Sequence, residues 1–194
     1  MIGNDIVDLD FAKNTSNWKR FGFLEKIFTK SEQLIISESS DKDRMVWRLW
    51  SMKEAAYKVY VRQYKSPFFN PNQLICKVFS SEKGLVSIRG NLFYTHSDLA
   101  DDFVHSVARP IAGKSDIQSD VFSVESQDHK PQSQEVRQKL RKALSETNLV
   151  EFMTDDFRFG KDDFGIPHLY RGSENMNIPF SLSHHGRFGG YAIS

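Results

Sequence analysis

The feature that most constrains this chain is residues 44–62, where apolar side chains recur with the spacing of one face of an α-helix. Lys53, Glu54 and Lys58 interrupt this pattern, and Glu54 and Lys58, four residues apart, lie on the same side of such a helix. A Glu-x-x-x-Lys pair is commonly an exposed ion pair worth about 0.3–0.5 kcal/mol. Here aromatic side chains flank the charges on both sides. We therefore expect a helix whose charged stripe faces a cleft.

The same stretch resembles a known signature. WSMKEAAYK, residues 50–58, is similar to the Trp/Phe-x-x-Lys-Glu-Ala/Ser-x-x-Lys motif of the 4'-phosphopantetheinyl transferase superfamily. That superfamily includes the holo-acyl-carrier-protein synthases and the larger surfactin-synthetase-activating type. The resemblance implies that Glu54 and Lys58 are catalytic, that Glu54 also binds a metal ion, and that Lys53 and Lys58 contact the phosphates of coenzyme A.

A second motif lies near the N-terminus. Asp5 interrupts the apolar run of a short predicted strand, where a carboxylate is costly unless it is paired, binds a cation or faces water at a sheet edge. The segment resembles the Gly-x-Asp-Ile-Val-Glu opening of holo-acyl-carrier-protein synthases, which implies that Asp5 and Glu54 bind Mg²⁺. Val7 stands where the larger type has a second acidic ligand, and Asp8 stands where Glu is usual. We therefore expect two protein carboxylates, with water and phosphate oxygens completing the octahedron, and leave open whether Asp8 joins them.

The third motif is FSLSHHGRFGGYAI, residues 180–193. Its hydroxyl, imidazole, guanidinium and turn N–H groups suit a phosphate, although a glycine-containing turn before a last strand explains the pattern as well. The segment resembles the family's Ser-His stretch, which implies that Ser183 and His184, with Arg187 as a further candidate, bind the 3'-phosphate of coenzyme A. Gly165-Ile-Pro167 is similar to the family's Gly-Lys-Pro, with Ile166 in place of the lysine. Zinc binding by the adjacent His184 and His185 is not expected, because neighbouring side chains of a strand point apart.

The composition of the chain limits its possible partners and its cellular compartment. The chain has 26 Lys and Arg against 25 Asp and Glu, so its net charge of +1 favours neither nucleic acid nor an anionic membrane as a partner. The one cysteine, Cys76, cannot form an internal disulfide and fits a reducing compartment. Three aspartates among the first ten residues exclude a signal peptide at this end, and no stretch is long and apolar enough to cross a bilayer. We expect a cytoplasmic protein.

The order of the motifs predicts the domain organisation. We expect an α+β protein with the 4'-phosphopantetheinyl transferase-like fold, in which two pseudo-related halves each pack a small antiparallel sheet on a long helix. Residues 1–110 form the metal- and pyrophosphate-binding half, residues 111–133 connect the halves, and residues 134–194, with a helix near 134–147, form the half that binds the 3'-phosphate. The motifs stand in permuted order relative to the larger, two-module type. The compact holo-acyl-carrier-protein synthases have the order found here, so an elongated member of that type describes the chain equally well. The protein is expected to be a monomer with both half-sites in the first case and a homo-oligomer with a site between two chains in the second. Whether the chain continues past Ser194 stays open.

The resemblance implies an enzyme. Such an enzyme would transfer the 4'-phosphopantetheine arm of coenzyme A to a serine of an apo acyl or peptidyl carrier protein, as in fatty acid biosynthesis, and release adenosine 3',5'-bisphosphate. Glu54 is the candidate base for the serine, or only a ligand of the metal. Two alternatives remain: a metal-dependent phosphohydrolase using Asp5, Asp8 and Glu54, and a non-catalytic module that binds coenzyme A or a carrier protein. Which carrier is modified is not determined by the sequence.

Overall fold

The structure, a computed structural model, describes residues 1–68, 70–111, 116–126, 128–146 and 157–194. The elements of the first half are β1 (Gly3–Asp8), α1 (Leu9–Thr15), α2 (Phe23–Ile27), α3 (Lys30–Glu38), α4 (Lys42–Tyr64), the 3-10 turn η1 (Pro71–Gln73), β2 (Leu74–Val78), β3 (Lys83–Ile88), β4 (Asn91–Leu99) and β5 (Phe103–Pro110). Those of the second half are β6 (Gln118–Ser123), α5 (His129–Glu146), β7 (Phe157–Lys161), β8 (Pro167–Arg171), β9 (Glu174–Asn175), β10 (Phe180–His185) and β11 (Phe188–Ile193).

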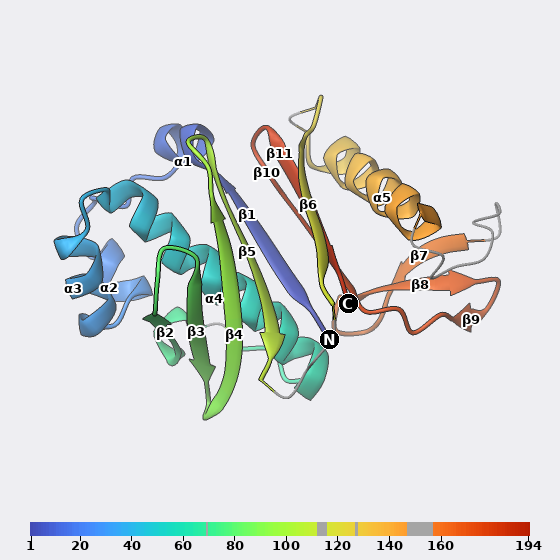
Figure 1. The fold of residues 1–194 in the computed structure, drawn as a ribbon, viewed down its shortest axis with the longest axis horizontal. Coiled ribbons are helices and arrows are strands. Elements are labelled where there is room, and N and C mark those ends of the chain that lie inside the picture. Colours follow the sequence, from blue (N-terminus) through green and yellow to red (C-terminus); the bar gives the residue numbers. More distant parts are fainter. Residues whose placement is uncertain (69, 112–115, 127, 147–156) are drawn as a thin grey trace.

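The first half is a five-stranded antiparallel sheet packed on α4. The strand order is β1-β5-β4-β3-β2, and α4 crosses one face of this sheet (Figure 1). The helix begins where the Asp41 side chain accepts a hydrogen bond from Arg44 N, and it ends at Lys65 in the left-handed conformation. Its buried residues include Val46, Leu49 and Met52. The helix predicted from the 44–62 pattern is therefore present and two residues longer at each end.

The second half packs α5 on a three-stranded antiparallel sheet of order β10-β11-β6. Its core is formed mainly by Leu140, Leu144, Phe180 and Tyr191, and β7, β8 and β9 form a separate small antiparallel sheet beside it. Helix α5 begins at His129, earlier than the predicted residue 134, and β6 lies within the segment expected to connect the halves. Each half thus has an antiparallel sheet on a long helix, which confirms the expected α+β architecture.

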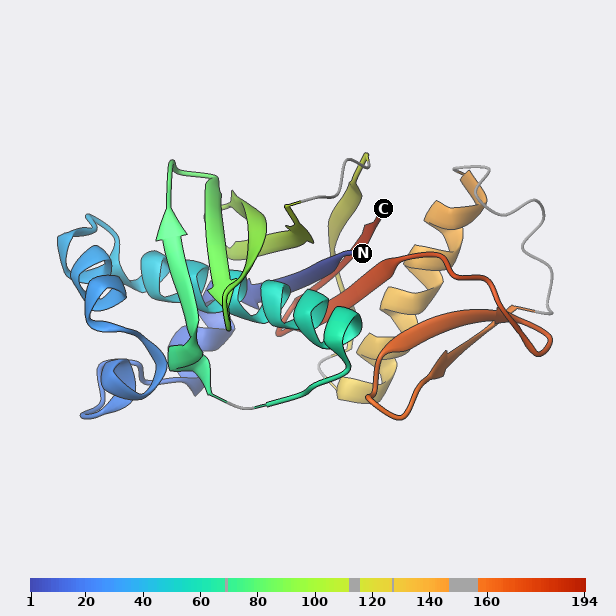
Figure 2. The ribbon, with the colours of Figure 1, turned by 90° about the horizontal axis from the view of Figure 1, so that it is seen from below.

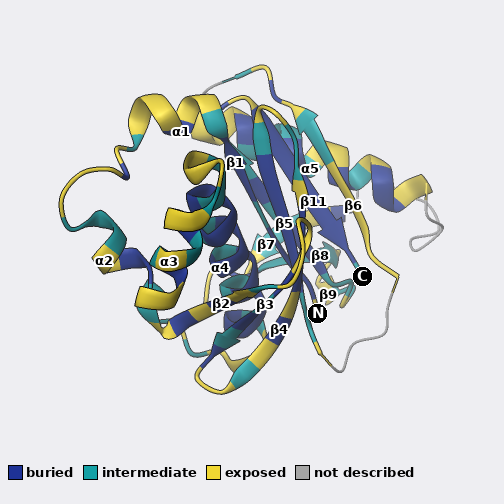
Figure 3. Ribbon diagram, turned by 60° about the vertical axis from the view of Figure 1, so that its left-hand side comes forward, coloured by how far each residue is buried: buried dark blue, intermediate teal, exposed yellow. Residues whose placement is uncertain are grey.

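The two halves meet along β1. One edge of β1 pairs with β5, so that Asp5 lies opposite Ser106. On its other edge, the backbone N–H groups of Asn4 and Asp8 donate to side chains of β10: Ser181 Oγ at 2.9 Å and His185 Nδ1 at 3.0 Å. Side chains therefore satisfy backbone donors that an adjacent strand would otherwise pair. Figure 3 shows that β1, β5 and β11 are largely buried as a result.

A glycine allows β1 to lie directly on α4. A Cβ atom at Gly3 would collide with the carbonyl oxygen of Ala55, so a larger residue would push the strand away from the helix. At the next contact, the Ser51 hydroxyl donates to the carbonyl oxygen of Asp5 at 3.0 Å. This close approach brings the side chain of Asp5 to the face of α4 that carries Glu54 and Lys58.

The chain ends lie together, and the second half extends away from the first. The N- and C-termini are adjacent in Figures 1 and 2, and Figure 2 shows the C-terminal end of α4 directed toward the part formed by α5 and β7–β9. Among the helices described, none combines the length and apolar character that a membrane span requires.

Lys53 is the largest fully buried polar side chain in the first half. Its side chain is 1% exposed, and Nζ donates to Glu32 Oε2 at 2.8 Å, to Ile27 O at 3.0 Å and to Pro71 O at 2.9 Å. Glu32 is also fully buried, and its Oε1 accepts from Cys76 N at 2.7 Å. The ammonium and the carboxylate are thus fully hydrogen-bonded, and they join α3, α4 and β2.

Replacing Lys53 tests this assignment. We expect Lys53→Met, which keeps the length of the side chain, to lower the free energy of unfolding by about 3–5 kcal/mol, because Glu32 keeps a buried charge without its partner. Urea denaturation measures the change.

The matched control is Lys142→Met, which removes an exposed ion pair with Glu146 on α5 and should cost less than about 0.5 kcal/mol. The double variant Lys53→Met, Glu32→Gln should recover part of the loss. Equal stability of Lys53→Met and the control would contradict a structural role for Lys53.

Candidate active site

Asp5 and Lys58 form the centre of the site. The Asp5 side chain is 15% exposed, and Lys58 Nζ lies 3.3 Å from Asp5 Oδ1 while donating to the carbonyl oxygen of Asn4 at 2.7 Å. Lys58 is therefore fixed between α4 and β1, with its side chain still 32% exposed.

Glu54 lies beside this pair, one helical turn before Lys58. Burial, and then the negative charge of Asp5, raises the pKa of Glu54 to about 7, while Lys58 opposes the shift. A carboxylate whose ionisation is disfavoured by burial and by a neighbouring carboxylate gains from a divalent cation, so Asp5 and Glu54 are a suitable donor set for one. No cluster of three His, Cys, Asp or Glu side chains with metal-binding geometry occurs among the described residues. The residues present thus fit a magnesium ion held by two protein carboxylates.

Asp8 is not free to join them. Its side chain is fully buried and caps α1 by accepting from the N–H groups of Asp10 and Phe11, each at 3.1 Å. Arg187 binds the same carboxylate through Nε at 2.8 Å, Nη2 at 2.7 Å and its backbone N at 2.8 Å. Burial alone would raise the pKa of Asp8, but the hydrogen bonds from Arg187 outweigh it and lower the pKa to about 2. Both oxygens are occupied, which argues against a hydrolase that uses Asp8.

Three residues selected from the motifs lie elsewhere. Arg187 is committed to Asp8, and Lys53 is enclosed with Glu32 in the core. Ser183 is buried and accepts a hydrogen bond from Asn4 Nδ2 at 2.8 Å, so its hydroxyl faces β1. Lys53 and Ser183 are thus turned toward partners inside the fold, and Arg187, whose side chain is 46% exposed, is engaged by Asp8. These contacts do not favour the expectation that the three side chains bind phosphate.

His184 follows Ser183 on β10, so its side chain points to the opposite side of the strand. Gln132 Nε2 donates to Gly186 O at 2.7 Å, so Gln132 Oε1, 2.7 Å from His184 Nδ1, accepts from the ring. His129 packs edge-on against His184 with ring centroids 4.7 Å apart. Burial, and then the positive charges of His129, Lys58 and other cations, lowers the pKa of His184 to about 4. The His184 ring is therefore neutral and has positive charges around it. Such a position favours the binding of an anion.

His185 points away from His184, as expected for neighbours on a strand. Its Nδ1 accepts from Asp8 N at 3.0 Å, and its ring packs edge-on against Phe11 at 5.1 Å. Burial lowers the pKa of His185. The neutral ring therefore carries its proton on Nε2. His184 and His185 are thus directed to different partners, Gln132 and Asp8.

A pocket of about 350 Å³ opens between the two halves, next to Lys58. Its lining contains several cations and no carboxylate among the described residues. The lining cations are Lys58, Arg62, Arg137 and Lys161, with the imidazoles of His129 and His184 beside them, and the apolar wall is formed by Tyr57, Val61, Pro67, Phe164, Ile166, Pro167 and Leu182. Such a mixture suits a ligand with phosphate groups and a flat ring system.

Sequence reasoning missed the contribution of α5. His129, Ser133 and Arg137 are spaced by four residues and form one stripe of the helix that lines the pocket. The buried residues Val136 and Leu140 form the neighbouring stripe. A polar stripe of this spacing beside an apolar one was a usable signal.

The β7–β8 hairpin also contributes to the pocket. Ile166 lines it, and Lys161 of β7 supplies a cation.

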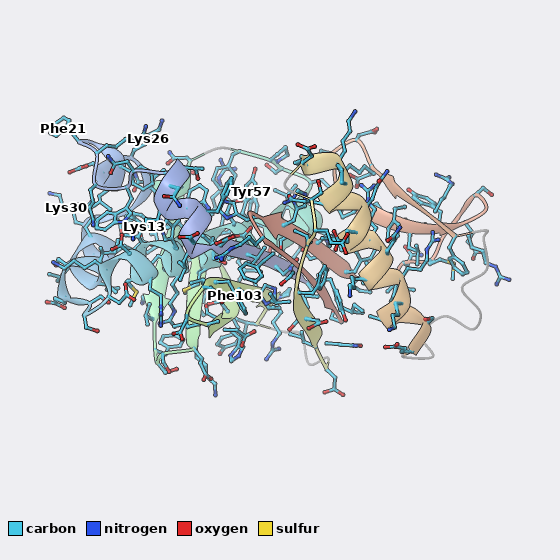
Figure 4. The ribbon with its side chains drawn as sticks, turned by 90° about the horizontal axis from the view of Figure 1, so that it is seen from above. Lys13, Phe21, Lys26, Lys30, Tyr57 and Phe103 are labelled. Carbon is cyan, nitrogen blue, oxygen red and sulfur yellow. The ribbon has the colours of Figure 1, made fainter. Side chains whose placement is uncertain are left out.

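Exposed basic and aromatic side chains lie at the end of the molecule formed by α1–α3. Figure 4 shows Phe21, Lys26 and Lys30 together at that end, Lys13 on α1, and Tyr57 of the pocket nearer the middle. Phe21 is fully exposed. This surface lies apart from the pocket lining.

The raised pKa of Glu54 has a measurable consequence. Because its folded-state pKa of about 7 exceeds the ordinary value of 4.5, Glu54 adds stability that is complete below about pH 4.5 and is lost as the pH rises through 7. Without divalent cations, we expect the free energy of unfolding of the wild type, relative to Glu54→Gln, to fall between these pH values. Urea titrations with a chelator measure it. A constant difference across this range would contradict the assignment.

Comparisons with known proteins bear on this site. A family model described as the 4'-phosphopantetheinyl transferase superfamily matches residues 1–108. Among curated proteins, none matches the chain. Several solved structures are also similar to this chain, and two of them are holo-[acyl-carrier-protein] synthases. The Helicobacter pylori holo-[acyl-carrier-protein] synthase in complex with coenzyme A is 17% identical, with 56% of this chain and 97% of that chain covered and a TM-score of 0.45.

The second is the Thermotoga maritima holo-[acyl-carrier-protein] synthase, which is 19% identical, with 66% of this chain and 72% of that chain covered and a TM-score of 0.43. The family match includes Asp5, Glu54 and Lys58 and covers more than half of the chain. The chain therefore belongs to the 4'-phosphopantetheinyl transferase superfamily and is a phosphopantetheinyl transferase.

Proposed function

We propose that this enzyme moves the 4'-phosphopantetheine arm of coenzyme A to a serine of an apo acyl or peptidyl carrier protein and releases adenosine 3',5'-bisphosphate. The observation that carries the proposal is the position of a cationic pocket without carboxylates beside the Asp5–Glu54 pair. The nucleotide phosphates fit the pocket, and the pyrophosphate would reach the carboxylates along Lys58.

Asp5 and Glu54 would hold a magnesium ion, which when bound supplies positive charge against the charge that develops on the pyrophosphate oxygens. Lys58 supplies a further positive charge from a fixed position, since its ammonium is held by Asn4 O and Asp5. In the transfer, the serine oxygen forms a bond to the β-phosphorus and the bond from that phosphorus to the bridging oxygen breaks. The leaving bisphosphate carries away the electron pair.

Glu54 is our candidate for the group that accepts the serine proton, directly or through a water molecule. A pKa of about 7 suits a base that works near neutral pH. Its role as a ligand of the metal competes with this assignment. Replacing Glu54 by Gln shows whether the carboxylate is needed, whether it acts as the base or as a ligand of the metal.

The 3'-phosphate is assigned to His184, His129 and Arg137. The Nδ1–H group of His184 is committed to Gln132, which leaves Nε2 for the pocket. An arriving phosphate would offset the nearby cations and favour protonation of Nε2, so that it can donate to a phosphate oxygen. This assignment replaces Ser183 and Arg187 by two residues of α5.

One chain supplies both walls of the pocket, α4 from the first half and α5 with β8 and β10 from the second. This supports a monomer with both half-sites rather than a homo-oligomer with shared sites. The cytoplasmic setting favoured by the single cysteine stays a prediction.

The reaction can be tested directly. We expect the wild type, incubated with Mg²⁺, coenzyme A and an apo carrier, to add the mass of the phosphopantetheine arm to the carrier. Asp5→Asn and Glu54→Gln should lower the rate by at least about a hundredfold, because each removes charge from the metal site. Intact-protein mass spectrometry measures transfer, and circular dichroism checks the fold.

Glu38→Gln, on the exposed side of α3, is the control and should transfer at the wild-type rate. Phosphate release without a carrier would favour the hydrolase. Tight binding of coenzyme A without any mass gain on several carriers would favour the binding module. Wild-type turnover by Glu54→Gln would refute the assigned site.

The phosphate assignment has its own test. His184→Ala and Arg137→Ala should weaken binding of coenzyme A by about tenfold to a hundredfold, the loss expected for a hydrogen bond to a charged group. They should change the affinity for 3'-dephospho-coenzyme A little. Calorimetry measures both ligands, with Lys142→Ala on the exposed side of α5 as the control. Equal losses for the two ligands would show that these residues do not contact the 3'-phosphate.

A further inference from the structure

The turn between β7 and β8 is organised by one carboxylate. Asp162 Oδ1 accepts from Phe164 N at 3.0 Å and from Ile166 N at 2.9 Å, and Gly165, with φ of +75°, donates its N–H to Asp162 O at 2.9 Å. His168 Nε2 lies 3.2 Å from Oδ2. Burial alone would raise the pKa of Asp162, but the hydrogen bonds from Lys65 and from the turn hold it well below its usual range. The turn thus has one defined shape, centred on a charged carboxylate.

The same carboxylate reaches the other half of the protein. Lys65, the left-handed residue that ends α4, places Nζ 2.7 Å from Asp162 Oδ2 and 5.5 Å from the centre of the Phe164 ring. The two side chains are 41% and 24% exposed, so water does not fully screen the pair. Between residues 1–110 and the described part of 118–194, the ion pairs are this one and Asp8–Arg187.

The position of Lys65–Asp162 gives it more than a local role. Tyr57, Lys58, Val61 and Arg62 of α4 form one wall of the pocket, while residues 164–167 of the turn form the facing wall. Lys65 comes after the lining residues of α4 in the sequence, and Asp162 comes before those of the turn. Neither residue lines the pocket itself. A contact outside the lining thus joins the two segments that line the pocket from either half.

We propose that the Lys65–Asp162 pair is a clasp that holds the 162–166 turn against the end of α4 and thereby sets the affinity of the pocket for the nucleotide end of coenzyme A. Both are positioning residues. The clasp rests on the proposed function, because it assigns coenzyme A to this pocket. When the clasp is broken, the facing wall moves from its bound position, and ordering it again costs part of the binding free energy. The chemistry at Asp5 and Glu54 is unaffected once the site is saturated.

The test separates binding from turnover. Lys65→Gln and Asp162→Asn each remove the ion pair, and Asn keeps an oxygen for the turn N–H groups. We expect each to raise KM and Kd for coenzyme A about twofold to fivefold at low salt, with kcat at saturating coenzyme A unchanged. Lys65→Arg should restore most of the affinity. High salt should weaken wild-type binding more than that of the variants.

The double variant distinguishes a clasp from a direct contact. For a clasp, Lys65→Gln combined with Asp162→Asn loses no more affinity than either change alone, because both remove one interaction. If Lys65 instead contacted a phosphate, Asp162→Asn would leave the affinity unchanged or raise it. Lys142→Gln, which breaks the exposed pair on α5, is the control and should bind as the wild type does.

Failure of the proposed function and failure of the clasp would give different results. If the folded wild type does not bind coenzyme A at all, the proposed function is wrong and the clasp with it. If the wild type binds and Lys65→Gln binds equally well with the same salt dependence, the clasp alone is wrong.

Discussion

The structure depends on the placement of one short strand, β1, between two sheets that both need it. On one edge it pairs with β5, and on the other its backbone N–H groups are satisfied by side chains of β10. Gly3 lets it lie against α4 without a clash. Because β1 is held on three sides, the carboxylate of Asp5 has a fixed position, and the Lys58 ammonium and the Glu54 carboxylate are placed relative to it.

Buried charges hold this arrangement together and are distinct from the charges available to a ligand. Lys53 with Glu32 joins the helices and sheet of the first half, and Asp8 with Arg187 joins β1 to the β10–β11 turn. Lys53, Glu32 and Asp8 are buried and fully hydrogen-bonded, whereas the side chain of Arg187 is 46% exposed and binds Asp8 through Nε and Nη2. A buried charge that loses its partner is strongly destabilising, which explains why the three buried charges are all paired.

The pocket also results from the way the two halves are held together. The halves are fixed to each other along β1 by Asp8–Arg187 and the serines of β10, and at the far end of α4 by Lys65–Asp162. The space between these contacts is lined by α4 on one side and by α5 and the β7–β8 turn on the other. A site built between two halves can combine cations that lie far apart in the sequence, which explains why no local cluster of basic residues marks it.

The sequence by itself determined the helix of residues 44–62, the α+β class and the three motifs, because helical periodicity and short signatures are local properties. It also predicted that Asp5 and Glu54 share one metal ion, which stays a prediction; the negative charge of Asp5 contributes to the raised pKa of Glu54. Only the tertiary structure decided which motif residues face the pocket. Lys53, Ser183 and Arg187 differ from Lys58 and His184 in their partners, Glu32, Asn4 and Asp8, which lie 21 to 179 residues away. The direction of a side chain depends on such distant partners, and a single sequence does not specify them.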